Sequence, residues 1–233
     1  MDDLIINLTI IITGLILGSF INVLAYRIPK GLPIIFSRSF CPKCNVSIPI
    51  YRNIPVITYI LQRGKCSHCN ESISIQYPIV ELFTPIIFYF GINNNWPIDE
   101  YILFMWITSI LITISIIDLK TLTIPLLLMI LMFIGQMIFL LFNLNVIHDM
   151  FLGSAFGLGY LGITFLVTSI IYKKQTLGYG DLLLVLLIGG WLGPINILIC
   201  IFFSSLSGLM IWSMQYFNNS KNIKLPFGTY LSI

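Results

Sequence analysis

Long apolar runs alternate with short polar stretches along this chain, and each run is close to the length that crosses a bilayer. Seven runs predict helices, at residues 4–26, 78–91, 101–117, 124–142, 150–172, 181–193 and 195–217. About 20 apolar residues span the hydrocarbon core of a membrane, so the second and sixth runs are short for a full crossing. The pattern predicts an all-α polytopic membrane protein with about seven transmembrane helices.

The composition favours a lipid bilayer as the partner of this chain. Of the 233 residues, 58% are hydrophobic and 9% are charged, whereas a soluble domain carries about 25% charged residues. The net charge of +3 is too small to indicate nucleic acid. Met1-Asp2-Asp3 lacks the basic start of a cleaved signal peptide, so we expect the first run to remain as a helix.

Basic residues predict the orientation, because Lys and Arg favour cytoplasmic loops. With the N-terminus outside and seven crossings, all twelve fall on the cytoplasmic side. They are Arg27, Lys30, Arg38, Lys43, Arg52, Arg63, Lys65, Lys120, Lys173, Lys174, Lys221 and Lys224. The opposite connections, at 93–100, 143–149 and 193–194, hold none. The basic residues therefore support the count of seven spans.

The polar and apolar stretches divide the chain into three expected parts. Residues 1–26 form a first transmembrane helix, residues 27–77 form a cytoplasmic loop, and residues 78–233 form a transmembrane core. No internal repeat is evident.

The loop holds four of the five cysteines as two Cys-x-x-Cys pairs. Cys41 and Cys44 form one pair, and Cys66 and Cys69 form the other after 21 intervening residues. Such knuckles are typical of a tetrahedral structural zinc site with four thiolate ligands, in a small zinc-ribbon-like loop. Two disulfides are the alternative, which a reducing cytosol disfavours. Cys200 lies in an apolar run and is expected to be a buried small hydrophobe.

Three carboxyl groups lie within or at the cytoplasmic end of a predicted span, namely Glu81, Asp118 and Asp181. Ionisable groups at such places are costly and indicate function. Asp118 closes the third span and Asp181 opens the sixth, so two helices can bring them together at one face. Paired aspartates suit peptide hydrolysis, in which one carboxylate takes a proton from water and the other acid protonates the scissile carbonyl.

Purely structural roles are the alternative for these carboxyl groups. Asp181 would cap its helix, while Asp118 and Glu81 would lie at the membrane interface. In the catalytic interpretation, the helix dipole favours Asp181 as the ionised partner and Asp118 as the one that holds the proton. Lys120 opposes this assignment by favouring the anion of Asp118. Gly178 and Gly180 are expected to permit a close backbone approach and positive φ angles beside Asp181.

Six motifs occur in one order along nearly the whole chain. They are Gly18-Ser19-Phe20-Ile21-Asn22 with Tyr26-Arg27-Ile28-Pro29, the double Cys-x-x-Cys loop with Asn53-Ile54-Pro55-Val56, Gln76-Tyr77-Pro78-Ile79-Val80-Glu81, Ile117-Asp118 with Ile124-Pro125, Gly178-Tyr179-Gly180-Asp181 with Gly189-Gly190-Trp191, and Leu225-Pro226-Phe227-Gly228. On these motifs the chain resembles the type IV prepilin peptidases, including the enzymes that process competence pseudopilins. A lone GxGD is weak, whereas this ordered set is highly specific.

The resemblance implies a membrane aspartic endopeptidase with Asp118 and Asp181 as its catalytic residues. Its substrates would be type IV prepilin or pseudopilin precursors, cut after a glycine at the cytoplasmic face of the bacterial cell membrane, for pilus assembly, competence or protein secretion. Many members also methylate the new N-terminus with S-adenosylmethionine, which no glycine-rich strand-turn-helix motif supports here. Supporting positions are Gly178, Gly180, Lys120 and Glu81, the last as a candidate partner for the substrate amine.

Three departures from the family pattern are visible. Family members usually have a further span after the last motif, whereas this sequence stops at Ile233. They commonly continue that motif with proline, where this chain has Thr229, and they usually carry an acidic or polar residue at the position of Lys120.

Two other classes compete with the peptidase. A non-enzymatic zinc-ribbon scaffold would depend on the cysteines and tolerate changes at both aspartates. A proton-coupled transporter would need carboxyl groups near the midplane with pathways to both sides, rather than two at one boundary.

Overall fold

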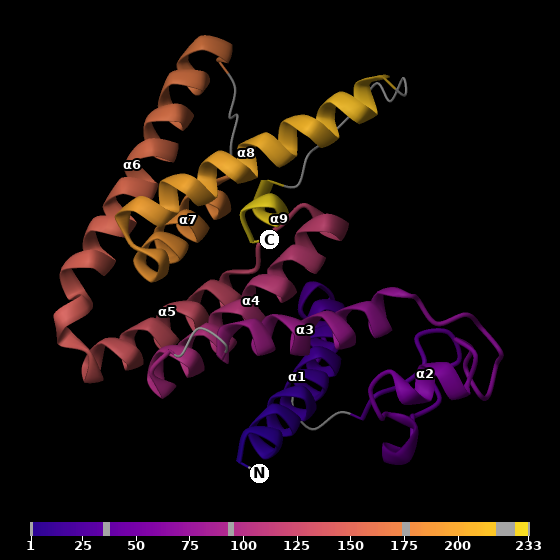
Figure 1. The fold of residues 1–233 in the computed structure, drawn as a ribbon. Helices are drawn as coiled ribbons and strands as arrows, with labels where there is room; N and C mark the ends of the chain where they lie inside the picture. The colour runs from indigo at the N-terminus through magenta and orange to yellow at the C-terminus, as the bar shows by residue number, and fades with distance from the viewer. Residues whose placement is uncertain (1, 35–37, 93–95, 174–177, 218–226, 233) are drawn as a thin grey trace. The chain divides into compact units, whose positions relative to one another are not determined.

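A computed structural model of the chain describes residues 2–34, 38–92, 96–173, 178–217 and 227–232. A helix corresponds to each of the seven predicted runs (Figure 1). They are α1 (Asp2–Arg27), α3 (Gln76–Ile92), α4 (Ile98–Thr121), α5 (Leu126–Phe142), α6 (Ile147–Tyr172), α7 (Tyr179–Leu192) and α8 (Pro194–Phe217). Lys174, Lys221, Lys224, residues 93–95 and the Leu225-Pro226 half of the last motif lie outside the described residues.

Short helices complete the secondary structure of the described residues. They are the 3-10 turns Ile28–Lys30, Ile50–Arg52 and Leu144–Val146, and the α-helices α2 (Ile57–Leu61) and α9 (Phe227–Ser232). The loop between α1 and α3 also holds two isolated β-bridges, Phe40 with Ser47 and Lys65 with Ser72. The described chain is therefore all-helical apart from this loop and the turns.

Four segments are long and apolar enough to cross a membrane: Leu4–Lys30, Ile98–Thr121, Leu144–Tyr172 and Pro194–Met214. The other three apolar helices, α3, α5 and α7, are shorter. The 14 residues of α7 rise only ~21 Å, against a hydrocarbon core of about 30 Å. Length and composition thus support a multi-pass membrane protein.

The chain divides into two compact units, Met1–Met105 and Trp106–Ile233, with the division inside α4. In the first unit α1 packs along α3 (Figure 1). Ile10, Phe88 and Tyr101 form a buried cluster there. The Tyr101 hydroxyl donates to the Phe88 carbonyl at 3.1 Å, which satisfies the phenol in this apolar setting.

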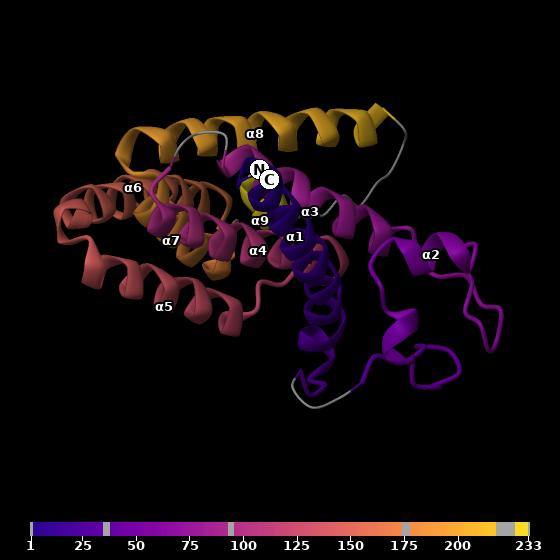
Figure 2. The same ribbon diagram turned by 60° about the horizontal axis from the view of Figure 1, so that its bottom comes forward.

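In the second unit α7 is the central helix. It packs against α5, α6, α8 and α9, and Figure 2 shows α6 and α7 together from a second direction. Its Leu184 and Val185 are fully buried, as is Ile197 of α8. Side chains on neighbouring helices also bind its backbone: Gln136 donates to the Leu187 carbonyl at 2.7 Å, and Ser154 donates to the Leu186 carbonyl at 2.9 Å. Packing within the unit therefore holds this short helix.

Candidate active site and metal centre

Asp118 lies in the last turn of α4 and is 4% exposed. Its Oδ2 accepts two hydrogen bonds from Thr229 of α9, from the backbone N–H at 2.8 Å and from the hydroxyl at 3.1 Å. The sequence places these residues 111 positions apart. A buried carboxyl group requires such donors, because burial without partners is costly.

Asp181 lies in the first turn of α7 and is half-buried. Its Oδ2 accepts from the backbone N–H of Gly178 at 3.2 Å, and its own N–H donates to the Gly178 carbonyl at 3.1 Å. This reciprocal pair is a helix-capping arrangement, so the structural role considered for Asp181 is real. Capping uses only one of its two carboxylate oxygens, which leaves the other for chemistry.

The two aspartates belong to the same unit. Ile124, in the α4–α5 connection, packs against Gly180, next to Asp181, and against Gly228, which adjoins the Asp118 carboxyl group. A Cβ atom placed on Gly180 would be 3.3 Å from the Ile124 Cβ, and one on Gly228 would be 2.8 Å from its Cδ1. The fold thus places the carboxyl group at the C-terminal end of α4 and the one at the N-terminal end of α7 near the same isoleucine.

The two glycines beside Asp181 differ from expectation. Gly178 has φ −75°, and Gly180 is not among the described residues with positive φ. The expectation of positive φ is therefore wrong, because the chain enters α7 through ordinary extended and helical conformations. The expected close approach of the backbone is found at Gly180, which contacts Ile124.

Lys120 is exposed at the end of α4, whereas Asp118 is buried.

Glu81 lies in the first unit, on α3, and is 7% exposed. Its Oε2 accepts a hydrogen bond from the backbone N–H of Val56 at 2.7 Å. Val56 has φ +62°, which is strained for a β-branched residue. Gly18 allows α1 to approach at this point, because a Cβ there would be 2.8 Å from the Glu81 Cα. The structure therefore gives this carboxylate a partner in the loop that follows Pro55.

Two motifs that are far apart in sequence meet through Asn22. Its amide nitrogen donates to the Tyr77 carbonyl at 3.1 Å, and its amide oxygen accepts from the Gln76 side chain at 3.2 Å. Asn22 is 1% exposed. The polar residue in an otherwise apolar run was the available sign of this role, since a buried amide needs partners.

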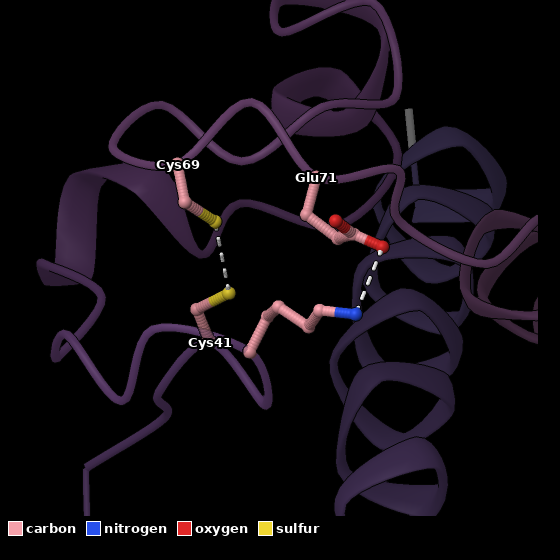
Figure 3. A network of polar contacts seen from close by, with 4 residues as sticks. Cys41, Cys69 and Glu71 are labelled. Atoms are coloured by element: carbon pink, nitrogen blue, oxygen red, sulfur yellow. Dashed lines mark hydrogen bonds and ion pairs between the residues drawn. The ribbon is translucent and has the colours of Figure 1, made fainter.

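The four loop cysteines come together as predicted. Their sulfur atoms all lie within 4.8 Å of one another, and Figure 3 shows Cys41 and Cys69 facing each other with 3.8 Å between their sulfur atoms. Tetrahedral zinc with Zn–S bonds of about 2.3 Å requires sulfur separations of ~3.8 Å. Beside the pair, Lys43 and Glu71 form an ion pair at 3.7 Å. The cluster is compatible with zinc.

The two knuckles are copies of one small motif, so the expectation of no internal repeat is wrong at this scale. In each, the residue after the second cysteine, Asn45 or Asn70, has φ +57° and donates its N–H to the carbonyl of the first cysteine. Each is closed by one of the two β-bridges. The sequence carries the signal as Cys-x-x-Cys-Asn-x-Ser-Ile, which occurs at Cys41 and again at Cys66.

The thiols of the cluster differ in acidity. Backbone hydrogen bonds from Cys69 and His68 lower the pKa of the Cys66 thiol to about 6. A backbone hydrogen bond from Glu71 lowers the pKa of Cys69, but desolvation and the three neighbouring thiols raise it by more, so that the pKa is raised overall. A metal ion bound to the four sulfur atoms would displace the protons that remain on them. The His68 side chain is exposed, outside the group of four sulfur atoms.

Comparison with known proteins agrees with these features. Residues 12–94 match the bacterial peptidase A24 N-terminal domain, and residues 105–213 match the type IV leader peptidase family. No significant match to a solved structure is found.

Relatives match most of the chain and are named prepilin leader peptidase/N-methyltransferase. The protein from Neisseria gonorrhoeae is 33% identical, over 85% of this chain and 78% of its own length. That from Pectobacterium carotovorum is 31% identical, over 95% and 88%, and that from Pseudomonas aeruginosa is 29% identical, over 96% and 86%. The chain belongs to the type IV leader peptidase family, an enzyme family of prepilin peptidases.

Proposed function

We propose that this chain is a membrane aspartic endopeptidase that removes the basic leader peptide of type IV prepilin or competence pseudopilin precursors, after a glycine at the cytoplasmic face. The observation that supports the proposal is that buried Asp118 and half-buried Asp181 belong to one unit, with Ile124 packed close to both of the segments around them. Both lie in the segment that matches the type IV leader peptidase family. The names of the relatives supply the substrate class.

In the proposed reaction the two carboxyl groups share one proton, because two close carboxylates would repel each other. The Asp181 carboxylate takes a proton from water, and the water oxygen bonds to the scissile carbonyl carbon. The Asp118 acid gives its proton to the carbonyl oxygen, forming a tetrahedral diol. The diol collapses as the C–N bond breaks: the proton held by Asp181 goes to the leaving nitrogen, and one diol hydroxyl returns its proton to Asp118, which restores the starting state. The helix dipoles support this division, since Asp181 lies in a first turn and Asp118 in a last turn.

The architecture proposed around this site has seven spans, with the N-terminus outside and the aspartates on the cytoplasmic side. Its three parts are the helix at 1–26, the loop at 27–77 and the core at 78–233. The distribution of basic residues supports this orientation.

The cysteine cluster is proposed to hold a structural zinc ion through Cys41, Cys44, Cys66 and Cys69. Four thiolates fill a tetrahedral site and leave no position for a substrate, so the metal would stabilise the loop.

Methylation of the new N-terminus with S-adenosylmethionine is proposed from the relatives' name alone. When bound, this cofactor would supply the methyl group that the freed amine accepts.

The test is cleavage of a prepilin-like peptide by the purified full-length protein, with product masses as the readout. Asp118→Asn and Asp181→Asn should each abolish cleavage after the leader glycine. Asp149→Asn is the matched control, because Asp149 is an exposed aspartate with its side chain 73% accessible. Cleavage that survives either active-site change would rule out the aspartic mechanism. Adding S-adenosylmethionine to the same assay should add one methyl group to the product if the second activity is present.

A further inference from the structure

The two oxygens of the Asp118 carboxyl group differ in their hydrogen bonds. Oδ2 accepts both donors of Thr229, at 2.8 Å and 3.1 Å. Among the described residues, no side chain or backbone group donates to Oδ1. An oxygen that already accepts two hydrogen bonds serves as the carbonyl-like atom of a carboxylic acid, so a proton on Asp118 belongs on Oδ1.

The segment that carries Thr229 is fixed in place beside Asp118. Thr229 is 2% exposed. Ser204 of α8 donates to the Tyr230 carbonyl at 2.8 Å, which ties α9 to α8. Gly228 permits the approach, because a Cβ there would be 3.0 Å from the Asp118 Oδ2. The Thr229 hydroxyl is also 3.3 Å from the Ser115 carbonyl, one turn before Asp118. The donors are therefore held by packing and do not depend on a mobile side chain.

We propose that Thr229 is a positioning residue for Asp118: it holds Oδ2 as an acceptor and leaves Oδ1 to carry the proton that the reaction uses. This inference rests on the proposed peptidase function. Fixing the carboxyl group in one orientation directs its proton toward the substrate and lowers the cost of reaching the transition state.

At position 229 this chain has threonine where the motif of the family it resembles commonly has proline, and the two residues differ in their hydrogen-bond donors. Proline has neither a backbone N–H nor a hydroxyl group. Threonine at this position supplies two donors that proline cannot, so this chain holds its Asp118 by a contact that the common motif excludes.

The experiment compares wild type, Thr229→Val, Thr229→Ser and Asp118→Asn as purified full-length proteins, with a prepilin-like peptide as substrate. Valine keeps the shape and the backbone N–H but removes the hydroxyl. Loss of one such bond should lower kcat about tenfold and change KM less than about twofold. Thr229→Ser should keep at least about half of the wild-type kcat.

Two results would overturn the inference while leaving the aspartic mechanism intact. One is wild-type kcat in Thr229→Val while Asp118→Asn is inactive. The other is equal slowing in Thr229→Ser and Thr229→Val, which would mean that the hydroxyl is not what acts. Cleavage by Asp118→Asn would instead remove the proposed function and the inference together.

A second measurement does not depend on activity. Infrared spectra of protein with isotope-labelled aspartate identify the Asp118 carboxyl band by its loss in Asp118→Asn. That band should shift in Thr229→Val and stay near its wild-type position in Thr229→Ser, because the hydroxyl bonds directly to Oδ2. An unshifted band in Thr229→Val would overturn the inference.

Discussion

The carboxylate of Glu81 binds the backbone N–H of Val56, with 2.7 Å between Oε2 and the nitrogen. This bond joins α3 to the loop that leads into α2, and it holds a β-branched residue at φ +62°. Glu81 is therefore a structural anchor in the first unit, whatever else it contacts when substrate is present.

Replacing Glu81 by alanine should destabilise the protein by about 1–3 kcal/mol, because the Val56 N–H would lose its partner beside a buried site. Glu71→Ala is the matched control: Glu71 is a half-exposed glutamate in the surface ion pair with Lys43, and such pairs contribute at most about 1 kcal/mol. The measurement is the midpoint of thermal unfolding in detergent. Equal midpoints for the two variants would contradict the anchoring role.

Removing one cysteine of the cluster should remove the metal. Purified wild-type protein is expected to carry about one zinc ion per chain, and Cys41→Ser should carry almost none, since a tetrahedral site with three thiolates is open. Cys200→Ser is the control, because Cys200 lies in α8 and outside the group of four sulfur atoms. Metal content is measured by elemental analysis. A zinc content in Cys41→Ser equal to wild type would show that the cluster is not the site.

The metal should also be released by acid. Zinc binds thiolates, so protons compete with it as the pH falls. The Cys66 thiol, with its lowered pKa of about 6, should be among the last to regain a proton. A chromogenic chelator should therefore take up more zinc the further the pH is lowered. Release that is independent of pH would argue against thiolate ligands.

The contact between α6 and α7 should not tolerate a methyl group. A Cβ on Gly153 would overlap the Gly189 carbonyl oxygen and lie 2.8 Å from the Gly193 Cα, both backbone atoms that cannot turn away. Gly153→Ala should cost about 1–3 kcal/mol or more through overpacking. Gly159→Ala, on the same helix with no atom within 4 Å of its Cβ position, should be neutral or stabilising. Thermal inactivation in detergent compares them, and equal effects would contradict the packing.

The proposed orientation can be tested in intact cells with the full chain. A short epitope inserted after Asn145, in the connection between α5 and α6, should bind antibody from outside. The same epitope inserted after Lys173, at the end of α6, should bind only after the membrane is made permeable. This pattern follows from the absence of basic residues at 143–149 and their presence at the end of α6. The opposite pattern would place the aspartates outside.

Much of the secondary structure could be predicted because it depends on residues that are close together in the sequence. Apolar runs predicted all seven helices, since a helix is the local way to satisfy backbone hydrogen bonds away from water. The cysteine pairs predicted their own cluster, because two short knuckles with fixed spacing need only the intervening segment to fold back. The repeat within those knuckles was equally local and was still overlooked. Cys200, expected to be buried, is half-buried, and its thiol donates to the Leu231 carbonyl of α9 at 3.8 Å.

Other features depend on contacts between residues that are distant in sequence. The short helix α7 is held by packing against four other helices. The residues of α7 alone do not predict these contacts. The pairing of Glu81 with Val56 and the contact of Asn22 with Tyr77 join α3 to two different segments. The sequence motifs include Glu81, Val56, Asn22 and Tyr77, but they do not predict that these residues are in contact.

The sequence by itself determined that the chain is a multi-helix membrane protein with a four-cysteine cluster and two candidate aspartates, because composition, periodicity and spacing are local properties. Only the tertiary structure decided that Thr229, 111 residues from Asp118, supplies both donors to its Oδ2. A hydrogen bond depends on the positions of two groups in space, and those positions are set by the packing of α4, α8 and α9, not by either segment alone.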